Sequence, residues 1–178
     1  GFTTTMVSNT EAYDGTTWTN SPTLGTARYG LGGAGDSSGS ALAFGGQNNG
    51  GTTYALTEEF TTSTNTITAG AWAAGGTLPT AVYDNAGAGT KNAGLSFGGD
   101  TAPDGKTTAT FEYDGSSWTA GGALNTGRRE LGGFGLQTAA VAACGGNYPA
   151  STLTEEYNGS SWTAGNAAST ARTMMGAA

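Results

Sequence analysis

Short apolar runs and short alternating runs follow one another along the whole chain, separated by turn-forming residues. Residues 41–44 are continuously apolar, whereas Leu153, Glu155 and Tyr157 would share one face of an extended strand. Turn signals recur at intervals of about 8 to 12 residues, as in proteins built from short antiparallel strands. The pattern predicts an all-β fold.

Two markers recur with the same phase and define an internal repeat. The first is an aromatic residue, a turn and a tryptophan, at residues 13–18, 60–72, 113–118 and 157–162. The second is a glycine doublet after an apolar run, at residues 45–46, 98–99 and 145–146. The four tryptophans are 54, 46 and 44 residues apart, so the repeat is 44 to 54 residues long.

Each repeat is predicted to form one unit of four antiparallel strands. The first strand is rich in glycine, whose small size would let neighbouring units crowd around an axis, and the second ends at the glycine doublet. An Asp-Gly or Asn-Gly turn joins the third strand to the fourth. The expected divisions are a half unit at 1–22, full units at 23–76, 77–122 and 123–166, and the first strand of a further unit at 167–178. These divisions predict an open arc from a larger ring, with a closed four-unit ring as the rival.

Composition supports strands and turns and excludes several functions. The chain has 33 Gly but only 6 Lys plus Arg, and its 17 aromatic residues recur in register, unlike those of a disordered chain. A net charge of −7 argues against nucleic acid as a partner, because phosphate binding requires clustered basic residues. No apolar run is long enough to insert into a membrane as a helix.

The candidate chemical groups favour a protein that is not an enzyme. The acidic pairs at 58–59 and 155–156 lie in predicted strands, where neighbouring side chains point to opposite faces and cannot flank one substrate bond. The Asp-Gly turns lack the spacing of a calcium loop. Cys144 is expected to be a buried strand thiol, because the chain has no His to activate it. We therefore expect no catalytic residue, no metal and no cofactor.

The order of glycine doublet, aromatic residue, tryptophan and arginine resembles the kelch repeat of β-propellers. The resemblance covers the whole chain and implies about three and a half kelch-like blades of four antiparallel strands. The aromatic-to-tryptophan spacing is 5 rather than the slightly longer spacing usual in kelch repeats, and Val82 replaces one of the arginines. The Gly- and Thr-rich composition is similar to kelch-type repeats of bacteriophage structural and tail-associated proteins.

The repeated aromatic residues are expected to be structural and largely buried between or within blades. They are Tyr13, Trp18, Phe60, Trp72, Tyr113, Trp118, Tyr157 and Trp162.

Comparison of the repeats also predicts two buried ion pairs. Arg28 occurs together with Glu58, and Arg128 together with Glu155, whereas the intervening repeat has Val82 and Phe111 at the same places. Exchange of both charges for apolar residues is the expected mark of direct contact, because one buried charge without its partner is strongly destabilising. We expect each arginine to meet its glutamate, bridging the first and third strands across the second.

The stretches that differ between repeats are the candidate contact loops, because loops carry recognition while a scaffold stays constant. The chosen residues are Gln47, Asn48, Asn49, Asp100, Asp104, Asn147 and Tyr148. With the resemblance, they imply a virion or extracellular structural module, associated with a phage tail or fibre, whose loops bind a host receptor or other virion or surface proteins. The alternative is a kelch scaffold for protein binding inside the cell or periplasm. Self-association to a homo-oligomer is left open.

Overall fold

The computed structural model describes residues 5–62, 71–102, 105–146 and 149–174, and every regular element in them is a β-strand. Three antiparallel sheets have four strands each. Sheet 1 consists of β3 (Tyr29–Ser37), β4 (Ser40–Gln47), β5 (Thr57–Thr61) and β6 (Ala71–Ala74). Sheet 2 consists of β7 (Ala86–Thr90), β8 (Ala93–Phe97), β11 (Thr110–Tyr113) and β12 (Trp118–Ala120). Sheet 3 consists of β13 (Gly132–Leu136), β14 (Ala139–Ala143), β15 (Thr154–Tyr157) and β16 (Trp162–Ala164).

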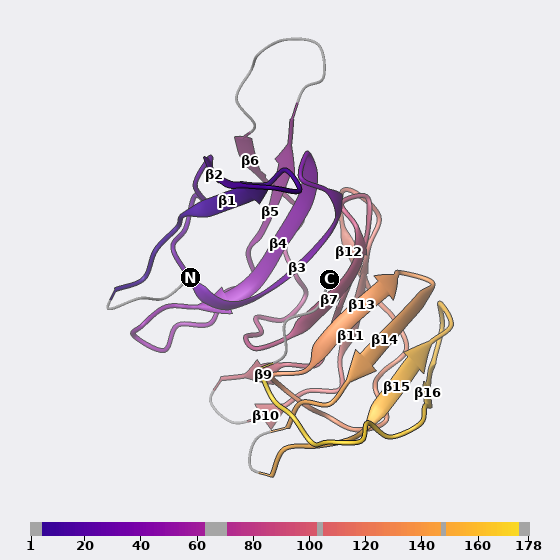
Figure 1. Ribbon diagram of the computed structural model, residues 1–178. Helices are drawn as coiled ribbons and strands as arrows, with labels where there is room; N and C mark the ends of the chain where they lie inside the picture. Colours follow the sequence, from indigo (N-terminus) through magenta and orange to yellow (C-terminus); the bar gives the residue numbers. More distant parts are fainter. Residues whose placement is uncertain (1–4, 63–70, 103–104, 147–148, 175–178) are drawn as a thin grey trace.

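Two smaller sheets accompany them. The N-terminal hairpin consists of β1 (Thr10–Tyr13) and β2 (Trp18–Ser21), and a short hairpin consists of β9 (Asp100–Thr101) and β10 (Gly105–Lys106). In each large sheet the strands lie in the order in which they occur along the chain. Figure 1 shows the N-terminal hairpin and sheet 3 at opposite ends of the molecule, with sheet 2 behind and between them.

The divisions expected from the sequence each enclose one of these sheets. The N-terminal hairpin falls within 1–22, and sheets 1, 2 and 3 fall within 23–76, 77–122 and 123–166. The hairpin forms a two-stranded sheet of its own, so in the described part of the chain it does not join the C-terminal residues to close a ring. Residues 175–178 of the expected last strand lie outside the described residues.

The Asp-Gly turns have a local physical cause. In the turn at 114–117, the Asp114 carboxylate accepts hydrogen bonds from the backbone N–H groups of Ser116 and Ser117 at 2.9 and 2.8 Å, and Gly115 has a φ of +95°. The Ser117 N–H, followed by the other hydrogen bonds of the turn, lowers the pKa of Asp114 to about 2. The predicted turn between third and fourth strands is therefore confirmed, with the Tyr113 and Trp118 positions paired across it.

The first strands of the three large sheets lie side by side and approach so closely that glycine is required. A Cβ atom at Gly87 on β7 would lie 2.3 Å from the Gly33 carbonyl oxygen on β3, and one at Gly133 on β13 would lie 2.7 Å from the Gly87 carbonyl oxygen. Real Cβ contacts are not that short, and the obstructing atoms include these backbone oxygens as well as ring atoms of Phe44 and Phe97, at 2.7 and 2.6 Å. The glycine-rich first strand is thus explained by crowding of neighbouring sheets, as the sequence predicted.

Gly87→Ala is expected to destabilise the fold by about 1 to 3 kcal/mol, the usual cost of overpacking. Gly33→Ala is the matched control, because it lies at the equivalent position of β3 and its Cβ atom would meet its nearest neighbour at an ordinary 3.5 Å. The control should change the free energy of unfolding by less than about 0.5 kcal/mol. Urea unfolding of the two variants measures the difference. Equal losses in the two variants would show that the close approach of neighbouring sheets is not what requires glycine.

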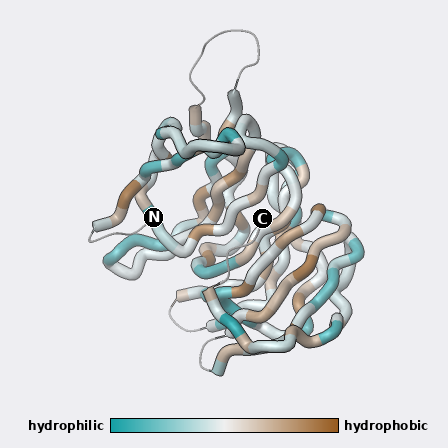
Figure 2. The backbone as a smooth tube through the Cα atoms, viewed as in Figure 1, coloured by the Kyte–Doolittle hydropathy of each residue, from teal (hydrophilic) through white to brown (hydrophobic). Residues whose placement is uncertain are grey.

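The apolar core is divided between the two interfaces of the large sheets. Leu42 and Phe44 of sheet 1 pack with Tyr113 and Trp118 of sheet 2 in one buried cluster. Leu95, Phe97, Tyr157 and Trp162 belong to the second cluster, between sheets 2 and 3. Figure 2 shows brown hydrophobic stretches along the strands and hydrophilic residues mainly toward the turns.

The glycine doublet at residues 145–146 does not occupy the same structural positions as the doublet at residues 45–46. The N–H of Cys144 donates to the Leu153 carbonyl, as the N–H of Gly45 donates to the Leu56 carbonyl, and Cys144 has a φ of +55°. Cys144 therefore occupies the position of the first glycine, in a left-handed conformation just after β14. Its thiol is buried as expected, but the prediction that it lies within a strand is wrong.

Candidate functional site

Both predicted ion pairs are present as contacts in the buried interior. The Arg128 guanidinium donates to Glu155 Oε1 at 2.8 Å, with the two side chains 2% and 4% exposed. Arg28 is fully buried and donates to Glu58 Oε1. The arginines lie in the connections before β3 and β13 rather than inside those first strands.

Backbone groups complete the surroundings of each pair. Arg128 also donates to the carbonyl oxygens of Cys144 and Leu153 at 2.7 and 2.8 Å. Glu155 Oε2 accepts from the backbone N–H of Asn125 at 2.7 Å, as Glu58 Oε2 accepts from that of Gly25. Each carboxylate therefore has a guanidinium on one oxygen and a backbone N–H on the other.

Sheet 2 replaces the whole arrangement with groups that need no charge. Val82 and Phe111 are 1% and 7% exposed and belong to the same buried cluster. Pro79 occupies the position of Gly25 and Asn125, and proline has no N–H that would require an acceptor. Sheet 2 therefore lacks the guanidinium, the carboxylate and the N–H that would bind the carboxylate. The proline changes together with the arginine and the glutamate, and comparison of the repeats could have revealed this.

The repeated aromatic residues are not all buried. Phe60, Tyr113, Trp118, Tyr157 and Trp162 are at most 7% exposed, and Trp72 is half-buried. The prediction is wrong for Tyr13 and Trp18, which are 47% and 67% exposed. The reason is that the outer face of the N-terminal hairpin has no large sheet packed against it among the described residues.

Two side-chain hydrogen bonds recur across both interfaces between large sheets. Tyr113 of sheet 2 donates to Glu59 of sheet 1, and Tyr157 of sheet 3 donates to Glu112 of sheet 2. Trp118 Nε1 donates to Thr57 Oγ1 at 3.0 Å, and Trp162 Nε1 donates to Thr110 Oγ1 at 2.9 Å. This set of contacts is called the tyrosine-tryptophan lock below.

The sequence interpretation missed the lock, although its signal is present in the repeats. Each Tyr of the lock faces a Glu of the preceding sheet, in the position just before that sheet's own aromatic residue. In the N-terminal hairpin that position is Ala12, and the aromatic residue of the following sheet is Phe60, which has no hydroxyl to donate. The presence of Glu59 or Glu112 therefore depends on whether the next repeat has a tyrosine to donate to it. This explains why these glutamates do not change together with the arginines of the ion pairs.

Alkaline pH is expected to weaken the lock. Burial, followed by the hydrogen bond with a glutamate, raises the pKa of Tyr113 and of Tyr157 to about 12, against about 10 in an unfolded chain. Between these values the folded state holds more protons, so the free energy of unfolding should fall as the pH rises from about 10 to 12. Tyr157→Phe should make that fall shallower in pH-dependent urea unfolding. An unchanged slope would contradict the assignment.

The candidate contact loops differ in how free their residues are. Gln47 and Asn48 are half-buried, and Asn48 Oδ1 holds the turn by accepting from the N–H groups of Gly50 and Thr52, both at 2.9 Å. Asn49 is exposed.

Asp100, one of the candidate contact residues, is buried by interactions within the chain. It is 7% exposed because its carboxylate pairs with Arg129 at 2.8 Å and also accepts from the Gly105 N–H at 2.8 Å. Asp104, Asn147 and Tyr148 lie outside the described residues.

A chain of backbone hydrogen bonds links equivalent residues of successive sheets. The N–H of Asp84 donates to the Gly30 carbonyl, that of Glu130 to the Asp84 carbonyl and that of Met174 to the Glu130 carbonyl, at 2.8 to 3.0 Å. All four residues have φ between +53° and +62°. Burial, followed by the charge of Glu130, raises the pKa of Asp84. This chain of residues with positive φ is a strained structural feature that the sequence did not indicate.

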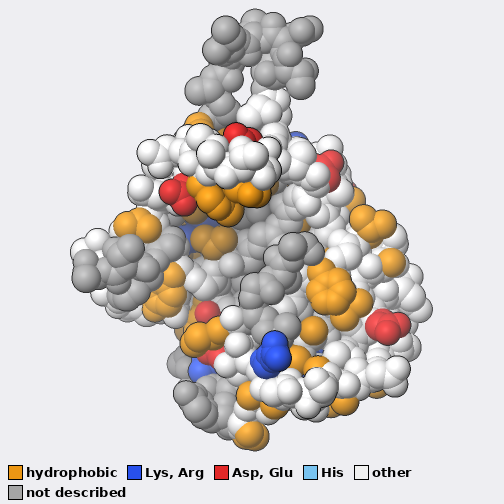
Figure 3. All heavy atoms as spheres, viewed as in Figure 1, with side chains coloured by type: hydrophobic (Ala, Val, Ile, Leu, Met, Phe, Trp, Pro, Cys, Tyr) orange, Lys and Arg blue, Asp and Glu red, His pale blue; other side chains and the backbone are white. Residues whose placement is uncertain are grey.

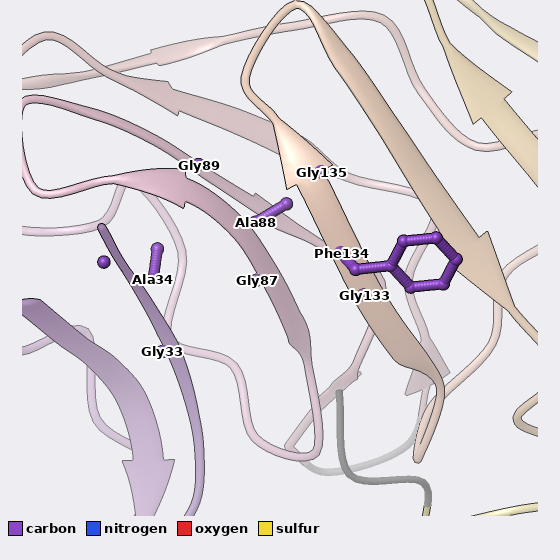
Figure 4. A pocket seen from close by; sticks show the side chains of 9 residues that line it. Gly33, Ala34, Gly87, Ala88, Gly89, Gly133, Phe134 and Gly135 are labelled. Carbon is purple, nitrogen blue, oxygen red and sulfur yellow. The ribbon is translucent and has the colours of Figure 1, made fainter. Parts of the chain in front are cut away.

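One of two cavities at the junction of all three large sheets opens between their first strands. It has a volume of about 370 Å³ and is lined by residues 33–35, 87–89 and 133–135, which are all Gly, Ala or Phe. Figure 4 labels lining residues on β3, β7 and β13. The lining offers backbone groups and one phenyl ring but no ionisable side chain, so it cannot supply acid or base chemistry.

Neither a metal cluster nor a membrane helix is found in the described ranges. No group of three or more Cys, Asp or Glu residues there is arranged to hold a metal ion. None of the described segments forms a helix that is long and apolar enough to cross a membrane.

Comparison with known proteins places the chain by its fold alone. No protein-family model matches the sequence, and no curated protein is significantly similar to it. The structure is similar to the solved structure of YjhT, with a TM-score of 0.66 and 12% sequence identity over 84% of this chain. The match covers 49% of YjhT, so this chain spans about half the length of that protein. The class thus defined is an all-β protein of repeated four-stranded antiparallel sheets.

Proposed function

We propose that this chain is a segment of a kelch-like β-propeller that acts as a structural and binding module and not as an enzyme. The proposed location is a virion or another extracellular surface, in association with a phage tail or fibre. Its loops would contact a host receptor or another virion or surface protein. The composition and the repeat pattern support this proposal, together with the fold similarity to YjhT.

The observation that carries the proposal is a constant framework with variable connections. The lock and the crowded glycines recur from sheet to sheet, whereas the connection between second and third strands differs between sheets 1 and 2. It forms the Asn48 turn in sheet 1 and the β9–β10 hairpin in sheet 2. A scaffold that keeps its core and varies its loops is typical of recognition proteins.

The buried charges favour a scaffold over an enzyme. Both buried arginines are committed to carboxylates and backbone carbonyls, and neither cavity at the sheet junction is lined by an ionisable side chain. An active site would instead be expected to combine a cavity with titratable groups.

A loop exchange tests the binding role. Residues 48–52 are replaced by a Gly/Ser stretch of equal length, and the purified chain is assayed for binding to host cells and to purified particles. The matched control replaces Lys91 and Asn92, the turn that joins β7 to β8, by Gly and Ser. We expect the first variant to lose binding and the control to keep it. Equal binding by both variants would contradict a role for this loop.

Localisation separates the two proposed settings. Immunogold labelling of purified particles with antibody against this chain should mark the tail or fibre. Recovery of the chain only in a complex with a soluble cellular protein would favour the intracellular or periplasmic scaffold instead.

A further inference from the structure

Two faces at opposite ends of the molecule are each half of an interface that the chain already forms twice. The outer face of the N-terminal hairpin has the exposed Tyr13 and Trp18, which correspond to Tyr113 and Trp118 of sheet 2. The outer face of sheet 3 has Thr154 and Glu156, which correspond to the acceptors of the tyrosine-tryptophan lock.

The correspondence of the acceptors follows from strand register. Thr57 and Glu59 of β5 lie opposite Phe44 and Leu42 of β4. In sheet 3, Thr154 and Glu156 lie opposite Ala143 and Val141. Thr154 is half-buried and Glu156 is exposed.

The outer face of sheet 3 also carries exposed apolar side chains. Phe134 and Leu136 on β13 are 43% and 59% exposed, at positions where β3 has Ala34 and Asp36. Figure 4 shows Ala88 directed from β7 toward β13 and Phe134 directed from β13 away from β7. Hydrophobic side chains are visible over β13 in Figure 3. Because they stand two residues apart on one strand, Phe134 and Leu136 point to the same face of the sheet.

Glu11 at one face and Arg172 at the other correspond to the two members of an internal ion pair. Glu11 stands two residues before Tyr13, as Glu155 stands two residues before Tyr157. The Arg172 carbonyl accepts from the Gly145 N–H, as the Arg128 carbonyl accepts from the Gly99 N–H, so Arg172 occupies the position of Arg128. Glu11 and Arg172 are both exposed, whereas the internal pair of Arg128 and Glu155 is buried.

We propose that a second copy of this chain docks its N-terminal hairpin on the outer face of sheet 3, in a head-to-tail contact that repeats the internal interface. Tyr13 of one copy then donates to Glu156 of the other, and Trp18 donates to Thr154. Arg172 of the receiving copy meets Glu11 of the docking copy, as Arg128 meets Glu155. This contact rests on the proposed propeller architecture, in which the second copy supplies the neighbouring blades, but it does not depend on the surface role proposed above.

The proposal predicts a contact of defined symmetry. The two faces differ, so each copy keeps one of them available after a contact forms, and association continues until a ring closes or a filament grows. Sedimentation velocity of the 178-residue chain should show assemblies larger than one chain that increase with concentration. The mass of a single chain at every concentration would overturn the proposal.

The charged pair provides the decisive test. Glu11→Arg and Arg172→Glu should each weaken association by about tenfold or more, because each places like charges together in the contact. Mixing these two variants should restore association, since each variant then meets an opposite charge at both of its faces. Failure of the mixture to associate would overturn the pairing, and so would a single variant that associates like the unmodified chain.

Two further variants separate the contact from folding. Trp18→Ala should weaken association by about thirtyfold or more, as for a central aromatic contact, while the circular dichroism spectrum stays unchanged. Asp36→Arg reverses an exposed charge on β3, outside both faces, and should leave association unchanged. Equal weakening by Asp36→Arg would show a general charge effect and overturn the proposal.

Discussion

Replacement of Arg128 by methionine is expected to destabilise the protein by about 3 to 5 kcal/mol. Glu155 is 3% exposed, and its carboxylate would lose the guanidinium while remaining buried. An uncompensated buried charge is far more costly than the loss of an exposed salt bridge. Urea unfolding measures the change, and Lys91→Met, which removes the partly exposed contact with Glu59, is the control that should cost less than about 1 kcal/mol.

Replacing the ion pair by the apolar residues found in sheet 2 should recover most of the lost free energy of unfolding. Arg128→Val with Glu155→Phe copies Val82 and Phe111, and replacement of a buried ion pair by apolar groups can be neutral or stabilising. The double variant still leaves the Asn125 N–H without its carboxylate acceptor. Addition of Asn125→Pro, which copies Pro79, should therefore improve on the double variant. Additive losses in the double-mutant cycle would contradict the coupling.

Trp118→Ala is expected to cost about 3 to 5 kcal/mol, as for other buried tryptophans. The ring is 7% exposed, lies 5.1 Å from the Phe44 ring and 4.8 Å from the Tyr113 ring, and donates to Thr57 across the interface of sheets 1 and 2. Truncation would leave a cavity between two sheets and a buried hydroxyl without its donor.

Trp18→Ala is the matched control for this prediction, because it changes the same repeat position where the side chain is 67% exposed. At concentrations where the chain is monomeric, it should change the free energy of unfolding by less than about 0.5 kcal/mol. Similar losses for the two tryptophans would show that the effect comes from the local hairpin rather than from packing between sheets.

Local chemistry and repetition were enough to predict much of this protein from its sequence. The hairpin turn follows from Asp114 and Gly115 alone, because the carboxylate and the positive φ act within four residues. The ion pairs could be predicted because the Arg and the Glu change together between repeats. A periodic sequence reports such long-range contacts, since each repeat is a natural variant of the others.

Only the tertiary structure decided which equivalent residues are buried. Tyr13 and Trp18 have the same local sequence as Tyr113 and Trp118, yet they are exposed because burial depends on a neighbouring sheet. Asp100 was chosen as a candidate contact residue, but the fold brings Arg129 to it from a distant part of the chain and buries it. Cys144 lies just after its expected strand, because backbone hydrogen bonds, and not the position of the glycine doublet in the sequence, fix the register. Sequence determines what each repeat can form, whereas packing between repeats determines which of those groups meet.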